Sequence, residues 1–251
     1  MKNYIRADYR RALTCRPHIV EMIIVLVLMI GLPVWKALTA TGNWNSIAYV
    51  DAISFPMFLV SLFLGMCDIL AVFSQDFKAK TIQIAIGRGI TRPQVVAVKL
   101  IDVALLTFTD LALLTALTTA LSFIVGTPLA GPLLAQHLIT NLGLWLEWVG
   151  YTAVVLPLLF HLQSMLVPIL IYLLFTGRAV YSILRMFTFW GPEWLQKLHL
   201  ESYTLDAFLD GLVTHLIMGR FNGGALLGVA VYLVLGYLIA VAVFRRQELE
   251  F

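Results

Sequence analysis

The sequence predicts an all-α, polytopic integral membrane protein with six transmembrane helices. Of its 251 residues, 61% are hydrophobic and only 12% are charged, whereas charged residues make up about 25% of an average soluble protein. Several apolar stretches extend over about twenty residues, the length at which an α-helix crosses a hydrocarbon layer of about 30 Å. These observations exclude a water-soluble globular domain, and we expect residues 1–251 to form a single membrane domain.

The first predicted element is an amphipathic helix over residues 1–16. Apolar side chains recur there at helical spacing and basic residues fill the positions between them, so we expect this helix to lie in the membrane interface. Pro17 and His18 separate it from the first span. Its apolar face consists of Ile5, Tyr9, Ala12 and Leu13.

Six apolar segments follow, separated by short polar or Gly-Pro turns. Residues 190–224, before the last segment, are mixed, with an apolar helical stripe interrupted by Asp206, Asp210 and His215. Because charges make a full crossing costly, this external amphipathic segment is expected to rest at the interface or to re-enter the membrane partway. The predicted spans are residues 19–38, 51–73, 95–125, 137–161, 165–184 and 225–244.

The basic residues predict the orientation of these spans. Most of the 17 Lys and Arg residues lie in the amino-terminal segment, in the connection after the second span, and directly after the last span. Cytoplasmic connections carry an excess of such residues. We therefore expect both termini to be cytoplasmic.

The connection between the second and third spans, residues 74–94, carries clear helical signals. Asp76 to Ile86 are predicted to form a short helix that Gly87 terminates, and Thr91 with Gln94 forms a capping box that begins the next helix. A short helix held between two spans is a lever that transmits the push of a soluble partner to both. The alternative is a solvated basic loop, since such loops are common in polytopic proteins.

The same connection contains an acidic-aromatic pair, Asp76-Phe77, followed by Lys80-Thr-Ile-Gln83 and Gly89-Ile-Thr-Arg92, and the last span runs into Phe244-Arg-Arg-Gln-Glu-Leu. With the amphipathic first helix and the six spans, these features resemble the ABC-2 type permeases. The resemblance covers the whole chain and is closest to the small bacterial permeases of antimicrobial-peptide and lantibiotic export or immunity.

The resemblance implies the permease subunit of an ATP-binding cassette exporter in a bacterial cytoplasmic membrane, moving an amphipathic peptide or hydrophobic drug. Its partners would be a separate ATPase subunit, a second copy or a paralogous permease, and membrane lipid. This chain has no GxxxxGK[ST] loop, so ATP and Mg²⁺ are expected in the ATPase and no cofactor here. The implied ATPase-coupling residues are Asp76, Phe77, Lys80, Ile82, Gln83, Gly87, Gly89 and Arg92.

Ionisable residues within apolar spans cost about 2.5 to 3.5 kcal/mol at mid-membrane, so they normally face protein or water. Asp110 and Glu147 lie deepest in the predicted spans and are candidates for a substrate path; the alternative is a protonated or hydrogen-bonded packing residue. Near the basic connection, Asp68 and Asp102 are expected to pair with Lys99 or Arg92.

The sequence predicts neither catalytic nor metal-ligating residues. It contains no HExxH and no GxSxG, and its five histidines have no metal-ligand spacing. The net charge of +3 is modest and basic residues flank apolar spans, which argues against nucleic-acid binding. Two alternatives to the permease stay open, a non-transporting membrane scaffold or sensor subunit and, ranked below it, an intramembrane enzyme.

Overall fold

The computed structural model describes residues 2–39, 44–79 and 81–247. Over these ranges the chain is helical with short connections and contains no β-strand, which confirms the all-α prediction. The elements are α1 (Lys2–Thr14), α2 (Arg16–Thr39), α3 (Ser46–Ala79), α4 (Thr81–Gly87), α5 (Arg92–Ile124), α6 (Pro132–Leu162), α7 (Leu166–Thr176), α8 (Ala179–Trp190), α9 (Glu193–Gln196), η1 (Leu200–Tyr203), α10 (Leu205–Ile217) and α11 (Gly223–Arg246).

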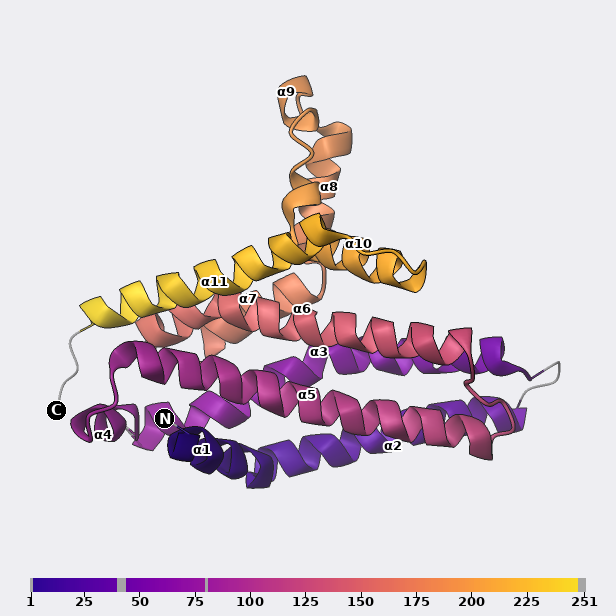
Figure 1. The fold of residues 1–251 in the computed structure, drawn as a ribbon, viewed down its shortest axis with the longest axis horizontal. Helices are drawn as coiled ribbons and strands as arrows, with labels where there is room; N and C mark the ends of the chain where they lie inside the picture. Colours follow the sequence, from indigo (N-terminus) through magenta and orange to yellow (C-terminus); the bar gives the residue numbers. More distant parts are fainter. Residues whose placement is uncertain (1, 40–43, 80, 248–251) are drawn as a thin grey trace.

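The long helices run along a common axis and form one elongated bundle (Figure 1). α2 packs against α3 and α5, α5 against α6, and α6 against α11. The short helix α4 lies at one end, together with α1 and the last turns of α11. We call this the α4 end, and the opposite end, where α5 connects to α6, the far end.

Several of these helices are suited to a membrane. Among the described residues, α2, α5, α6 and α11 are long and apolar enough to cross one. α7 and α8 pass the same test together but are bent by 53° at their junction, and α3 contains an apolar stretch, Leu62–Ser74. Large apolar side chains cover the outside of α2 and α11, as expected for helices that face lipid. The helices are therefore compatible with a membrane-embedded protein.

The predicted fifth span, residues 165–184, is wrong as one straight helix, because the chain turns sharply at Gly177 and Arg178. Arg178 adopts a left-handed backbone conformation, with φ of 56°. Its N–H donates to the carbonyl of Phe175 and that of Gly177 to the carbonyl of Leu173, both at 2.9 Å. These bonds close the last turn of α7, and α8 starts in a new direction.

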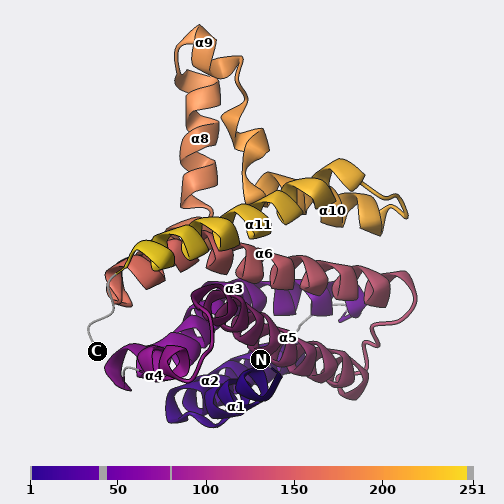
Figure 2. The ribbon, with the colours of Figure 1, turned by 60° about the vertical axis from the view of Figure 1, so that its left-hand side comes forward.

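Residues 179–204, comprising α8, α9 and η1, leave the bundle and return to it (Figures 1 and 2). We call this segment the arm. It packs mainly on itself and on the two helices that flank it, α7 and α10. After the arm, α10 buries Leu205, Leu209 and Leu212 against the bundle and forms an antiparallel pair with α11.

The first helix, α1, packs against protein rather than presenting its whole apolar face to lipid. Ala12 and Asp8 are buried, and the hydroxyl groups of Tyr9 and Thr109 of α5 lie 2.6 Å apart. At about 1.5 Å per residue, α3 and α5 are each about 50 Å long and exceed the about 30 Å of a hydrocarbon core. α1 packs on α5 and, less extensively, on α3.

Candidate functional site

The region predicted to couple to a partner lies at the α4 end. α3 continues through Asp76 to Ala79, so the predicted start of the short helix at Asp76 is wrong and α4 begins at Thr81. The Asp76 carboxylate is buried and paired with cations of other helices. Asp76 therefore does not start a solvent-exposed helix, contrary to the prediction from the sequence. α4 ends at Gly87, as predicted.

A compact turn joins α4 to α5. The N–H of Ile90 donates to the carbonyl of Ala85 at 3.2 Å, which closes the end of α4, and Gly89 adopts a left-handed conformation with φ of 90°. The side chain of Gln94 accepts a hydrogen bond from the N–H of Thr91 at 3.0 Å, so the predicted helix start at Thr91 is confirmed. Gly89 is thus the position at which this turn needs a glycine.

α4 has one face in the core and one face on the surface. Ile82 is 6% exposed and belongs to the main core cluster, as does the side of α5 that it meets. On the opposite face, Ile84 is 53% exposed, and Gly87 and Arg88 are exposed as well. Ile82 therefore fastens α4 to the bundle, whereas Ile84 and Arg88 form the surface that a partner can reach.

The remaining predicted coupling residues fall into three groups. Gln83 is half-buried beside the exposed face of α4. The side chain of Phe77 and residue Lys80 lie outside the described residues. Asp76 and Arg92 are both engaged in bonds to other helices, which the following paragraphs describe.

A buried charge network joins α1, α3, α4 and α5. Lys99 of α5 has no exposed surface and forms ion pairs with Asp76 of α3 and Asp8 of α1. Arg11 of α1 donates to Asp76 at 2.8 Å, and the hydroxyl of Thr81, the first residue of α4, donates to the same carboxylate. One carboxylate thus holds three other helices, and we call these five residues the Asp76 network.

The charges of this network decide the ionisation of its central residue. Burial raises the pKa of Asp76, but Lys99, with further help from Arg11 and Thr81, outweighs burial and places this pKa below its ordinary value of 3.8. Asp76 is therefore ionised in the folded protein. Through these charged contacts the network links the amino-terminal helix α1 to α3 and α5, the helices on either side of α4.

The predicted pairing of Asp68 and Asp102 with Lys99 or Arg92 is wrong. Lys99 is committed to Asp8 and Asp76, and neither carboxylate oxygen of Asp102 has a hydrogen-bond partner in the described part of the chain. Asp68 instead faces His18, with 3.5 Å between its Oδ1 and the ring Nδ1. Asp8 was not predicted as a partner of Lys99, because a carboxylate within a basic helix carries no local signal for a contact with α5.

Arg92 joins the start of α5 to the end of α11. Its Nη1 lies 2.8, 2.7 and 2.8 Å from the carbonyl oxygens of Phe244, Arg245 and Gln247. The last carbonyl groups of a helix have no partners within it, so a cation at this position both satisfies and neutralises them. Arg92 therefore ties two helices together at the α4 end.

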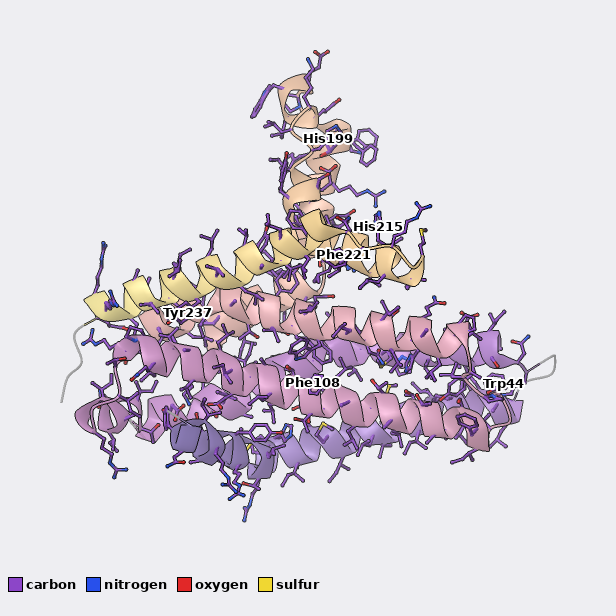
Figure 3. All side chains as sticks on the ribbon, viewed as in Figure 1. Trp44, Phe108, His199, His215, Phe221 and Tyr237 are labelled. Carbon is purple, nitrogen blue, oxygen red and sulfur yellow. The ribbon has the colours of Figure 1, made fainter. Side chains whose placement is uncertain are left out.

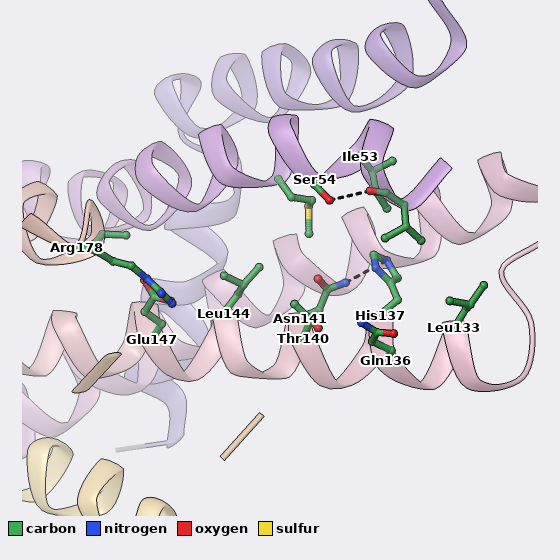
Figure 4. A pocket seen from close by; sticks show the side chains of 13 residues that line it. Ile53, Ser54, Leu133, Gln136, His137, Thr140, Asn141, Leu144, Glu147 and Arg178 are labelled. Atoms are coloured by element: carbon green, nitrogen blue, oxygen red, sulfur yellow. Dashed lines mark hydrogen bonds between the residues drawn. The ribbon is translucent and has the colours of Figure 1, made fainter. Parts of the chain in front are cut away.

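A mostly apolar cavity with a few polar side chains lies between α3, α6 and the end of α7 (Figure 4). Its volume is about 340 Å³, within the range of small-molecule sites, about 300 to 1,000 Å³. Glu147, 7% exposed, lines it, and among the described residues no hydrogen bond or ion pair within 4.0 Å engages its carboxylate. The other lining residues are Val50, Ile53, Ser54, Met57, Leu133, Gln136, His137, Thr140, Asn141, Leu144, Thr176 and Arg178.

The two residues predicted for a substrate path lie in different places. Glu147 faces the cavity, whereas Asp110 is absent from its lining and lies beside His18 of α2, with 3.6 Å between Asp110 Oδ1 and the ring Nε2. Both carboxyls are buried.

Arg178, at the bend between α7 and α8, links the cavity to the arm. Its guanidinium binds both carboxylate oxygens of Asp210 of α10, at 2.8 and 3.1 Å, and its Nε lies 3.9 Å from Asp206. The residue directly before the arm, Arg178, is thereby bonded to α10, the helix that directly follows the arm. This ion pair could not be found from the sequence, because its members are separated by the length of the arm.

The chain matches no protein-family model, no curated protein and no solved structure. Its function must therefore be inferred from the arrangement of its own residues.

Proposed function

We propose that this chain is the permease subunit of an ATP-binding cassette exporter that moves an amphipathic peptide or hydrophobic drug across a bacterial cytoplasmic membrane. The observation that carries the proposal is the way α4 is attached to its neighbouring helices. A short helix with one exposed face connects two helices of about 50 Å, and the Asp76 network ties all three to α1. Such an assembly transmits a force applied at its end into the bundle.

In this proposal the chain crosses the membrane six times. α2, α3, α5, α6 and α11 account for five of them. We assign the remaining one to α7 and α10 together, because α7 starts at the α4 end and α10 continues toward the far end after the arm (Figure 1). Their 11 and 13 residues give about 36 Å of helix, enough for a hydrocarbon core of about 30 Å. This topology places both termini on the α4 side, which we assign to the cytoplasm.

In this proposal a separate ATPase, which binds ATP and Mg²⁺, docks on the exposed face of α4 and alternates between two shapes. Because each shape binds a different arrangement of the permease, nucleotide binding and hydrolysis shift the helices between inward-facing and outward-facing states. A second copy or a paralogous permease completes the transporter. The permease itself carries out no chemistry.

Glu147 is the better candidate for contact with a substrate, since it lines the cavity between α3, α6 and α7 and Asp110 does not. Glu147 places an acidic group, near Arg178, in a mostly apolar cavity, an arrangement that suits the polar group of an amphipathic molecule. The apolar residues around it suit the remainder of such a molecule.

The test is purification of the full-length protein from its host in mild detergent, with mass spectrometry and an ATPase assay of the proteins that co-purify. A stoichiometric ATPase subunit is expected. Arg88→Glu, on the turn after α4, should reduce its recovery at least tenfold. Arg220→Glu makes the same charge change in the exposed turn between α10 and α11 and should leave recovery unchanged.

The outcome against the proposal is also specific. Normal expression of the wild-type protein without any co-purifying ATPase would contradict the permease assignment and favour a scaffold or sensor. Charged substitutions at Ile82 do not provide this test, because Ile82 is buried and its substitution damages the fold itself.

A further inference from the structure

We propose that His18, Asp68 and Asp110 form a binding site for one divalent transition-metal ion inside the bundle. The three residues come from α2, α3 and α5, and they are 3%, 0% and 3% exposed. This inference is independent of the permease function, because it concerns groups that neither the α4 surface nor the cavity uses.

The first argument is geometric. One ligand atom from each residue can be chosen so that all three lie within 4.8 Å of one another. The ring of His18 lies between the carboxyls, with Nδ1 3.5 Å from Asp68 and Nε2 3.6 Å from Asp110. Ligands about 2.0 to 2.2 Å from a tetrahedral metal ion are themselves about 3.3 to 3.6 Å apart. Because the two carboxyls face different ring nitrogens, a rotation of the His18 ring is needed to bring one nitrogen and both carboxylates onto one ion.

The second argument is the lack of other partners. In the described part of the chain, Asp68 and Asp110 lie within hydrogen-bond reach of each other, a bond that needs a proton on one of them, and the His18 ring nitrogens lie 3.5 and 3.6 Å from their carboxyls. A buried carboxylate without a partner is strongly disfavoured. In the Asp76 network, Lys99 and Arg11 provide the compensation. Here, no Lys or Arg forms an ion pair with Asp68 or Asp110 among the described residues, and a divalent cation would balance both charges.

The donor set indicates the kind of metal. One imidazole nitrogen with carboxylate oxygens suits Zn²⁺, Mn²⁺ or Fe²⁺, whereas Mg²⁺ and Ca²⁺ prefer oxygen ligands alone. Glu21, one turn after His18 on α2, is half-buried and close enough for its charge to interact with His18 and Asp110. Its carboxyl lies within hydrogen-bond reach of the Cys67 thiol and would have to turn from it to serve as a fourth ligand.

The burial indicates the role of the site. All three residues are almost completely enclosed, as in structural metal sites, which leave no coordination position open to solvent. The ion would join α2 to α3 and α5 by metal–ligand bonds. Since the metal would bind the folded protein, it should raise the free energy of unfolding.

The experiment uses untagged full-length protein in detergent, dialysed first against EDTA and then against ZnCl₂ or MnCl₂. Metal is quantified by mass spectrometry after gel filtration, and thermal unfolding is recorded with and without metal. We expect about one equivalent of metal per chain and a higher Tm in its presence. His18→Ala and Asp68→Asn should each lower the metal affinity at least tenfold. His199→Ala is the matched control, because His199 lies on the arm, away from the bundle (Figure 3).

Two results would overturn the proposal. In the first, wild-type protein binds no more metal than Asp68→Asn, and after EDTA treatment Asp68→Asn is more stable than wild type. This result would mean that protons, not a metal ion, neutralise the carboxyls. The other is an equal loss of metal in His199→Ala, which would indicate surface binding. If the core variants fail to fold, the wild-type protein is titrated with Co²⁺, and the absence of a saturable visible absorption band at one equivalent contradicts the site.

Discussion

The guanidinium of Arg92 lies 5.5 Å from the centre of the Phe244 ring, although 152 residues separate the two along the chain. Arg92 is the first residue of α5, and Phe244 lies in the last turn of α11. The contact therefore joins the helix that follows α4 to the helix that ends the bundle. It stabilises the α4 end where we propose that a partner binds.

Replacing Arg92 by Ala should lower the free energy of unfolding by about 1 to 3 kcal/mol, because charged hydrogen bonds to the end of α11 and a contact with an aromatic ring are lost. Thermal or denaturant unfolding in detergent measures the change. Arg88→Ala, an exposed arginine four residues earlier, should change stability by less than about 0.5 kcal/mol. Equal effects of both variants would show that Arg92 does not join the helices.

Lys99→Met should destabilise the protein by about 3 to 5 kcal/mol, because it leaves the carboxylates of Asp8 and Asp76 buried beside fewer cations. Unfolding in detergent and the amount of monodisperse protein measure this effect. Adding Asp76→Asn to Lys99→Met should restore part of the stability, since one uncompensated charge is removed. No recovery in the double variant would contradict direct coupling of Lys99 and Asp76.

The low pKa of Asp76 predicts a dependence of stability on pH. Since this pKa is below its ordinary value of 3.8 in the folded protein, the unfolded chain binds the proton more readily. The stabilisation is therefore complete above about pH 5 and is lost as the pH falls through 3.8 and the lower folded pKa. Tm measured between pH 6 and pH 3 should fall less steeply for Asp76→Asn than for wild type; parallel curves would contradict the assignment.

Arg178→Gln should loosen the arm without unfolding the bundle, because it removes the ion pairs with Asp206 and Asp210 at the junction. Limited proteolysis should cut residues 179–204 several times faster than in wild type. Arg185→Gln is the control, since Arg185 is an exposed residue of α8 beside Phe189. Accelerated cleavage outside the arm would indicate a general loss of structure.

Gly236→Ala should destabilise the protein by about 1 to 3 kcal/mol, because a Cβ atom there would overlap the backbone carbonyl of Ala153 where α11 crosses α6. A backbone group cannot rotate away as a flexible side chain can. Gly31→Ala in α2, where a Cβ atom meets nothing within 4 Å, should instead stabilise by about 0.5 to 1 kcal/mol. Unfolding temperatures of the two variants should therefore move in opposite directions.

The sequence predicted the elements that depend on local signals. The capping residues Thr91 and Gln94 and the terminal Gly87 were confirmed because a helix end is determined by a few neighbouring residues. The break at Gly177 and Arg178 was missed, because the apolar residues continue across it and the turn depends on a distant pair of carboxylates in α10.

Depth and pairing were harder to predict, since they depend on residues far apart in the sequence. Trp148 and Tyr49 are of the residue types that commonly anchor helices at a membrane interface, but neither has exposed surface. Trp148 packs among the side chains between α2, α3 and α5, and the Tyr49 hydroxyl donates to the carbonyl of Thr118. Lys99 was expected to pair with Asp68 or Asp102, but its partners are Asp8 and Asp76, which only the fold brings to it.

The junction at Arg178 has an evolutionary consequence. Because the arm leaves the bundle beside Arg178 and returns beside Asp206, its length can change without altering the register of any long helix. Insertions and deletions among descendants of this sequence should accumulate between residues 179 and 204.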